Sequence, residues 1–234
     1  MNPSIKEKLE SKGYRVSIFE NREDAVGYLK DSIKNTTVGI GGSQTANALD
    51  LRHELSDGNT IYTRDFPNSG ETKLSNTNKA ATTDIYILSA NAISDNGEII
   101  NIDGTGNRLA SSLYGHSKVY YIVGENKIGG TLEEAIARAR NTAGPKNALR
   151  LHRETPCAIK VRDELEKRFR DLYKTEEIDQ QLWARFIADT DISELTRCYD
   201  CKVPDRVCRS ILVHMTKPGS MEEEVIIVKE KLGY

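Results

Sequence analysis

The sequence predicts an α/β fold, with a mostly parallel sheet flanked by helices, and three observations lead to this prediction. First, short runs rich in β-branched and aromatic residues alternate with longer amphipathic stretches, as they do in parallel βαβ units. Second, the runs at 37–42 and 118–124 pass straight into glycine, which is typical of strands that end in tight loops. Third, Thr131 and Glu134 have the spacing of a capping box, which marks a helix start after the second run.

The individual elements follow from capping and periodicity. Ser4 and Glu7 have capping-box spacing and Gly13 ends that first helix, while a second helix is expected from about Asn21. The remaining expected helices are 43–55, 70–82 and 131–143, the last of them ended by Gly144 and Pro145. The expected strands are 37–42, 59–63, 84–90, 98–102, 118–123, 211–215 and 225–228, with a turn at 95–97.

The segment 159–195 departs from this alternation because it is charged and helix-favouring throughout. It contains Trp183, the only tryptophan, and its apolar residues recur at helical spacing, which predicts two amphipathic helices that leave the sheet and return. Their apolar stripe needs a covering surface, either the rest of the chain or a second copy, so a homodimer is one alternative. We therefore expect a single domain over 1–234, with 159–195 as a helical insertion within it.

Composition and charge narrow the class of protein. The chain has 234 residues and carries 33 Lys plus Arg against 35 Asp plus Glu. The net charge of −2 excludes a broadly basic nucleic-acid-coating protein, so no nucleic-acid partner is expected. No apolar run approaches the roughly 18–20 residues that span a bilayer, and the first residues lack an apolar signal core. We therefore expect no membrane insertion and a cytoplasmic location.

Three loops at the expected carboxyl ends of strands carry groups that bind anions. The glycines at 39–42 precede Ser43 at a helix start, where free backbone N–H groups attract a phosphate or a carboxylate. The loop at 89–108 is dense in amide and hydroxyl groups, and a third loop follows at 124–128. Because open α/β sheets bind ligands at this edge, we expect one shared cleft for a small anionic substrate. The alternative is that these residues only build turns and helix caps. The candidate ligand-binding residues are Gly41, Gly42, Ser43, Thr45, Asn91, Asn101, Gly104, Thr105, Gly106, Asn107 and Asn126.

Two residues of these loops are the candidate catalytic groups. Asp103 lies among the glycines of the second loop and is the candidate general base, although an Asp there is equally suited to capping a turn. Lys127 in the third loop is placed to pair with an anionic substrate or a phosphate, while a solvated loop lysine is the commoner case.

The four cysteines form a separate constellation late in the chain. Cys198 and Cys201 have C-x-x-C spacing, Cys208 follows them, and Cys157 could supply a fourth thiol. Four thiolates suit an iron–sulfur cluster or, alternatively, tetrahedral zinc. A redox dithiol at Cys198 and Cys201 is the rival interpretation, and four unrelated buried thiols is the third. The clustering of three cysteines within eleven residues favours the metal site.

Taken together, four segments resemble the LUD domain of lactate-utilization proteins. These segments are 38–45, 89–108, 123–128 and 138–148, and they occur in the family's order and spacing. The resemblance implies a fold like that of sugar-phosphate isomerases, CoA transferases and formyltetrahydrofolate cyclo-ligase, with anionic ligands bound at glycine loops. The cysteine motifs resemble a cysteine-bearing single-domain subgroup in which the two cysteine segments lie closer together. Cys157 therefore joins the site only if the two ends of the helical arm are adjacent.

The resemblance also implies a function. The family's role suggests a subunit in the oxidation of lactate or a related 2-hydroxy acid, acting with iron–sulfur partner subunits. One alternative is a stand-alone isomerase, transferase or ligase for a phosphorylated or CoA-like substrate, with a structural metal site. Another is a non-catalytic binding module whose helical arm recruits a partner. Whether the chain is itself an enzyme stays open at this point.

Overall fold

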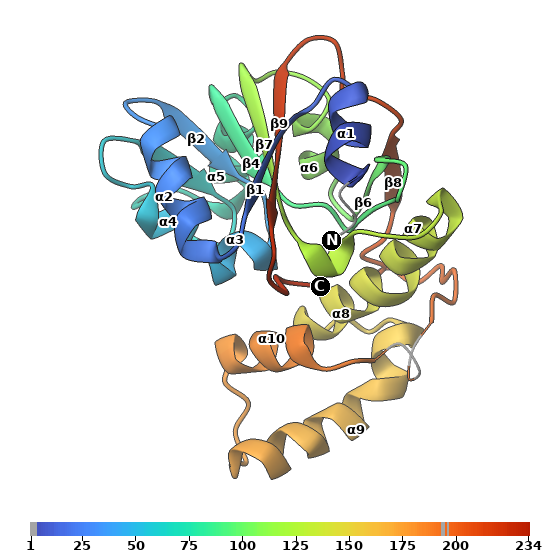
Figure 1. Cartoon of the computed structure of the whole chain (residues 1–234). Helices are drawn as coiled ribbons and strands as arrows, with labels where there is room; N and C mark the ends of the chain where they lie inside the picture. The colour runs from blue at the N-terminus through green and yellow to red at the C-terminus, as the bar shows by residue number, and fades with distance from the viewer. Residues whose placement is uncertain (1–3, 193–194, 196) are drawn as a thin grey trace.

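The centre of the molecule is a six-stranded parallel sheet with the order β1-β9-β7-β4-β2-β3, as the computed structural model shows for residues 4–192, 195 and 197–234 (Figure 1). Its strands are β1 (Arg15–Phe19), β2 (Thr37–Ile40), β3 (Thr60–Thr63), β4 (Ile85–Leu88), β7 (Lys118–Gly124) and β9 (Glu222–Val228). Every pairing within this sheet is parallel. The predicted α/β class and parallel sheet are therefore confirmed.

Helices cover both faces of this sheet, which explains why strands such as β4 and β7 are largely apolar. In β7, Val119, Tyr121 and Val123 enter one core, while Tyr120 and Ile122 enter the core on the opposite face. The first core is closed by α1 (Ser4–Ser11) and α5 (Lys73–Ala80). The second is closed by α2 (Arg22–Ser32), α3 (Gln44–Ala48) and α4 (Leu51–Glu54).

A smaller antiparallel sheet stands beside the main one and carries the second predicted loop. Its strands are β5 (Ala92–Ile93), β6 (Ile99–Asp103) and β8 (Ser210–His214), in the order β5-β6-β8. The predicted turn at 95–97 joins β5 to β6, with Gly97 at a φ of +85° that favours glycine. The short helix α6 (Asn107–Ser111) follows β6. The loop after β6 therefore lies at the edge where the parallel strands end.

Two predicted helix boundaries are wrong. The stretch 43–55 is divided into α3 and α4, because Asp50 adopts a left-handed φ of +46° between them. Gly144 and Pro145 do not end the preceding helix either. α7 (Leu132–Arg138) continues through a π-helical turn (Ala139–Ala143) into α8 (Gly144–Arg150). Pro145 is tolerated because it lies in the first turn of α8, where a missing N–H breaks no hydrogen bond of that helix.

The helical arm consists of α9 (Pro156–Tyr173) and α10 (Gln180–Asp189), which pack with α8 below the sheet in Figure 1. Its apolar stripe is buried by the chain's own helices. The ring of Phe169 meets Trp183 edge to face at 5.4 Å, and Trp183 stacks on Phe186 at 5.5 Å. The chain itself therefore covers the stripe. Of the predicted arm, residues 193 and 194 lie outside the described part of the chain.

One carboxylate of β9 is buried without a partner. Glu223 is 2% exposed, and neither of its carboxylate oxygens accepts a hydrogen bond within the described residues. Burial raises the pKa of Glu223 to about 8, against a small opposing effect of Lys217. Since an unpaired buried carboxylate is costly when ionised, this side chain is held protonated near neutral pH.

No helix in the described part of the chain is long and apolar enough to cross a membrane.

Candidate functional site

A cavity of about 510 Å³ opens at the carboxyl ends of three neighbouring parallel strands, β2, β4 and β7. We call it the cleft. Gly42 and Ser43 follow β2, Ser89 and Ala90 follow β4, and Lys127 follows β7. The loop after β6, the helix α8 and the segment 204–209 form the remaining walls. Parallel α/β sheets bind their ligands at this edge.

The cleft carries an excess of positive charge. Three carboxylates line it, namely Asp65, Asp103 and Asp205. Eight basic side chains line it: Arg64, Lys73, Arg108, Lys127, Arg150, Arg153, Arg206 and Arg209. Two of the carboxylates are already paired, Asp103 with Arg108 and Asp205 with Arg153. Arg206 in turn pairs with Asp200 at 2.9 Å. Basic side chains still outnumber the carboxylates around the cleft, so it is suited to an anion.

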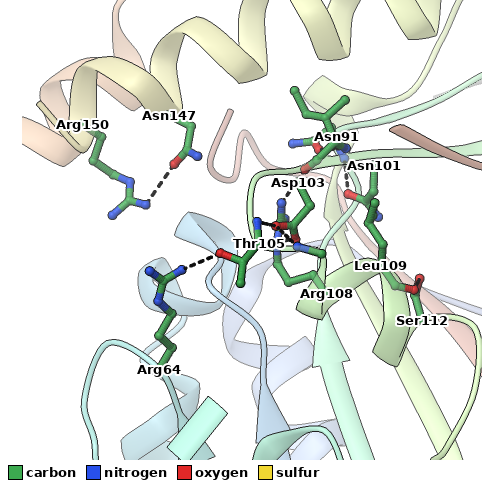
Figure 2. Close-up of polar contacts among 12 residues, drawn as sticks. Arg64, Asn91, Asn101, Asp103, Thr105, Arg108, Leu109, Ser112, Asn147 and Arg150 are labelled. Carbon is green, nitrogen blue, oxygen red and sulfur yellow. Dashed lines mark hydrogen bonds and ion pairs between the residues drawn. The ribbon is translucent and has the colours of Figure 1, made fainter. Parts of the chain in front are cut away.

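Asp103 shapes the loop after β6. Its Oδ1 accepts the backbone N–H groups of Thr105 at 2.8 Å and Gly106 at 3.0 Å, and its Oδ2 accepts Nε of Arg108 at 2.9 Å (Figure 2). Burial alone would raise the pKa of Asp103, but Arg108 and the two N–H groups hold this pKa below its ordinary value. Both oxygens are thus occupied by the turn and by Arg108. This arrangement favours the turn-capping role over that of a general base.

Two arginines from separate parts of the chain line the cleft (Figure 2). Arg64, directly after β3, lies 3.4 Å from the hydroxyl of Thr105. Arg150 on α8 donates to Oδ1 of Asn147 at 2.9 Å and to the hydroxyl of Tyr234 at 2.8 Å. These contacts leave part of each guanidinium free to contact a ligand in the cleft.

Lys127 is the most deeply buried cation of the cleft. It lies in a short 3₁₀ helix (Glu125–Lys127) and is 3% exposed. Its Nζ donates to Oγ1 of Thr45 at 2.8 Å and to Oγ of Ser89 at 3.1 Å. Burial, with repulsion from Arg138 and Arg108, lowers the pKa of Lys127 to about 7. The alternative of a solvated loop lysine therefore does not describe its position, because the side chain is buried.

The predicted site residues divide into two groups. Those that line the cleft are Gly42, Ser43, Asn91, Asp103, Gly104, Thr105, Asn107 and Lys127. Those that lie behind its walls are Gly41, Thr45, Asn101, Gly106 and Asn126. Asn126 illustrates the second group, since its Oδ1 accepts the N–H of Leu232 at 3.0 Å and so holds the last residues of the chain against the cleft.

Several residues of the cleft could not be identified from the sequence pattern. Arg64, Arg150, Arg153 and Tyr234 come from segments without a glycine loop or a recognisable motif. They become neighbours only because the helical layer of α8 folds over the end of the sheet. A search for surplus arginines near strand ends would have found Arg64 alone, because only that residue directly follows a predicted strand.

The four cysteines meet beside the cleft. Cys157, Cys198, Cys201 and Cys208 all line one small cavity of about 10 Å³. All four side chains are partly buried. Burial raises the pKa of both Cys157 and Cys208. The ends of the arm are therefore adjacent, and Cys157 lies with the other three.

The thiols do not form a ready-made metal centre. Within the described residues, no three or more His, Cys, Asp or Glu side chains are arranged so that they could hold a metal ion as they stand. Polar or basic side chains contact two of the thiols. Oγ1 of Thr155 lies 3.2 Å from Sγ of Cys157, and Nη2 of Arg140 lies 3.5 Å from Sγ of Cys198. The donor set of four thiols still suits zinc or an iron–sulfur cluster, provided that the side chains draw together.

The thiol cavity and the cleft share part of their walls. Gly144 and Val207 line both. Arg206, which lines the cleft, donates to the backbone carbonyls of Cys201 at 2.7 Å and Cys208 at 2.8 Å. The segment between Cys201 and Cys208 thus belongs to both sites at once.

The chain is similar to a known protein family and to a solved structure. The family model described as LUD domain matches residues 3–182. A solved structure described as a DUF162 family protein from Deinococcus radiodurans is similar to the chain, with 14% identity and a TM-score of 0.47. That similarity covers 96% of this chain and 94% of the other. No curated protein matches the chain.

Proposed function

The chain belongs to the LUD domain family, and from this premise we propose that it binds a small carboxylate, lactate or a related 2-hydroxy acid, as a subunit of a system that oxidises it. The observation that carries the proposal is the surplus of basic side chains around the cleft, together with the glycine loops at its floor. A carboxylate ligand would accept hydrogen bonds from the guanidinium groups and from the loop N–H groups.

In this proposal each wall has a role. The N–H groups and hydroxyl at Gly42 and Ser43 bind the carboxylate, because they lie at the start of the helical segment after β2. Arg64 and Arg150 orient it from the opposite walls. Asp103 keeps the loop after β6 in the shape that presents Thr105 to the ligand.

Replacing Arg64 tests ligand binding directly. Arg64→Met should weaken the binding of L-lactate or pyruvate about tenfold or more, since a hydrogen bond to a charged group contributes about 1.5–3 kcal/mol. Arg64 is exposed and pairs only weakly with Thr105, so the variant should keep the stability of the wild type. Isothermal titration measures the affinity. Arg168→Met, which removes an exposed arginine of α9 that pairs with Glu164, is the matched control and should leave the affinity unchanged. Equal affinities for both variants would contradict the proposed cleft.

We further propose that the four thiols hold an iron–sulfur cluster, with zinc as the alternative. Cys157, Cys198, Cys201 and Cys208 would be the ligands, and a cluster bound there would accept and pass on single electrons. Arg140 and Arg206 would offset the negative charge of the thiolates, because both lie against the cysteine segment.

Metal analysis with anaerobic spectroscopy tests the cysteine site. The anaerobically purified protein should contain iron and absorb in the visible range, and Cys201→Ser should lose most of both. Ser43→Ala is the matched control, because it alters the cleft and should leave the metal content as it is. Stoichiometric zinc without iron would contradict the electron-transfer role, and the absence of any metal would contradict the site itself.

The size of the cleft favours one second candidate. A volume of about 510 Å³ exceeds what a three-carbon acid fills and falls within the range of cofactor-sized pockets. An isomerase, transferase or ligase acting on a phosphorylated or CoA-like substrate would use this space more fully. Titration with a sugar phosphate and a CoA ester, beside lactate, separates the two candidates by which ligand binds more tightly.

A further inference from the structure

Lys127 is a buried amine that contacts neutral groups. No described carboxylate forms an ion pair with it, and the charged groups that act on it most are the guanidiniums of Arg138 and Arg108. Its hydrogen-bond partners are the neutral hydroxyls of Thr45 and Ser89. A buried ammonium without a carboxylate is costly, so the neutral amine is well populated at neutral pH. The lowered pKa, about 7, agrees with this reasoning.

A neutral lysine amine is a nucleophile, which a protonated one is not. Lysines that react with carbonyl groups are activated by an apolar environment or by neighbouring cations. Lys127 is shielded from water, since it is 3% exposed, and it lies near two arginines. It also lines the cleft, beside the cations that would hold a carboxylate. A 2-oxo acid bound by its carboxylate would therefore bring a carbonyl group into the same cavity as this amine.

We propose that the amine of Lys127 forms an imine with the carbonyl group of a 2-oxo acid held in the cleft. The inference rests on the proposed function, because it needs the cleft to bind the carboxylate. The lone pair of Nζ adds to the carbonyl carbon as the C=O π bond opens, and one of the two amine protons passes to the oxygen to give a carbinolamine. The second amine proton then leaves with the hydroxyl group as one water while the C–O bond breaks and the C=N double bond forms. The reaction is a condensation, with no net oxidation or reduction.

Ser89 is placed to carry protons during this condensation. Its Oγ lies 3.1 Å from Nζ of Lys127 and 3.3 Å from Oγ1 of Thr45. A hydroxyl at this distance can pass a proton from the nitrogen toward the departing oxygen. Ser89 is thus a positioning and relay group, while Lys127 is the group that makes the covalent bond.

The experiment is reductive trapping on the full-length protein. Wild-type protein is incubated with pyruvate and sodium borohydride, and the modified lysine is located by peptide mass mapping. We expect N-(1-carboxyethyl)lysine at Lys127, formed at least tenfold faster than at other lysines. Lys127→Met should lose the adduct, and Lys167→Met, which removes an exposed lysine of α9 outside the cleft, should keep it. The wild-type peptide map answers the question even if Lys127→Met fails to fold.

The outcomes separate this inference from the proposed function. Pyruvate binding by titration without any adduct at Lys127 would overturn the imine and leave the carboxylate cleft in place. Adducts spread evenly over several lysines would also overturn it, since they show ordinary surface reactivity. Neither binding nor an adduct would overturn both. A trapping rate that rises between about pH 6 and 8 and then levels off would support the neutral amine as the reacting form.

Discussion

Replacing Gly104 with alanine is expected to weaken ligand binding and metal binding together. A Cβ at this position would lie 2.8 Å from the carbonyl oxygen of Val207 and 3.4 Å from its C and Cα atoms, so backbone would have to move. Val207 lines both the cleft and the thiol cavity, which makes one displacement affect two sites. We expect a loss of about 1–3 kcal/mol in the free energy of unfolding, as is usual for overpacking.

The measurements are a urea titration, the affinity for pyruvate and the metal content of the same preparation. Affinity should fall about tenfold or more, since about 1.4 kcal/mol corresponds to tenfold. Gly219→Ala is the control, because a Cβ there meets no atom within 4 Å. If Gly104→Ala kept full affinity and full metal content, the wall shared by the cleft and the thiol cavity would not be required for either binding site.

The second large effect concerns Glu223. Glu223→Gln should raise the free energy of unfolding at pH 7 by about 1–3 kcal/mol. The pKa of this carboxyl is raised by burial from an ordinary 4.5 to about 8 in the folded chain. The unfolded chain therefore releases its proton at a lower pH than the folded chain does. The contribution of Glu223 to stability is complete below the ordinary pKa and is lost as the pH rises toward about 8.

The test is the pH dependence of the free energy of unfolding. In the wild type, ionisation of Glu223 should lower this free energy between about pH 5 and 8. In Glu223→Gln the decrease over the same interval should be smaller. Glu222→Gln, at the exposed start of the same strand, is the matched control and should follow the wild type. Parallel stability curves for the wild type and Glu223→Gln would show that the carboxyl ionises freely in the folded chain.

Local sequence patterns predicted most of the sheet but less of the cleft. Strands such as 85–88 and 118–124 are predicted well because both faces are buried, so their residues are apolar throughout. β1 (Arg15–Phe19) was not predicted, since only Val16 of its five residues is buried and its pattern resembles a loop. The glycine loops after β2 and β6 can be recognised in the sequence. The positions of Arg150 and Tyr234 cannot, because their place in the cleft depends on how α8 and the chain's last residues pack.

The adjacency of the arm's two ends has a mechanical consequence. Cys157 begins α9 and Cys198 follows α10, so any group bound by both thiols would close a loop that contains the whole arm. Cross-linking a loop of several tens of residues restricts the unfolded chain by about 3–4 kcal/mol. Such a link would hold the two ends of the arm together, while the rings of Phe169, Trp183 and Phe186 pack α9 against α10.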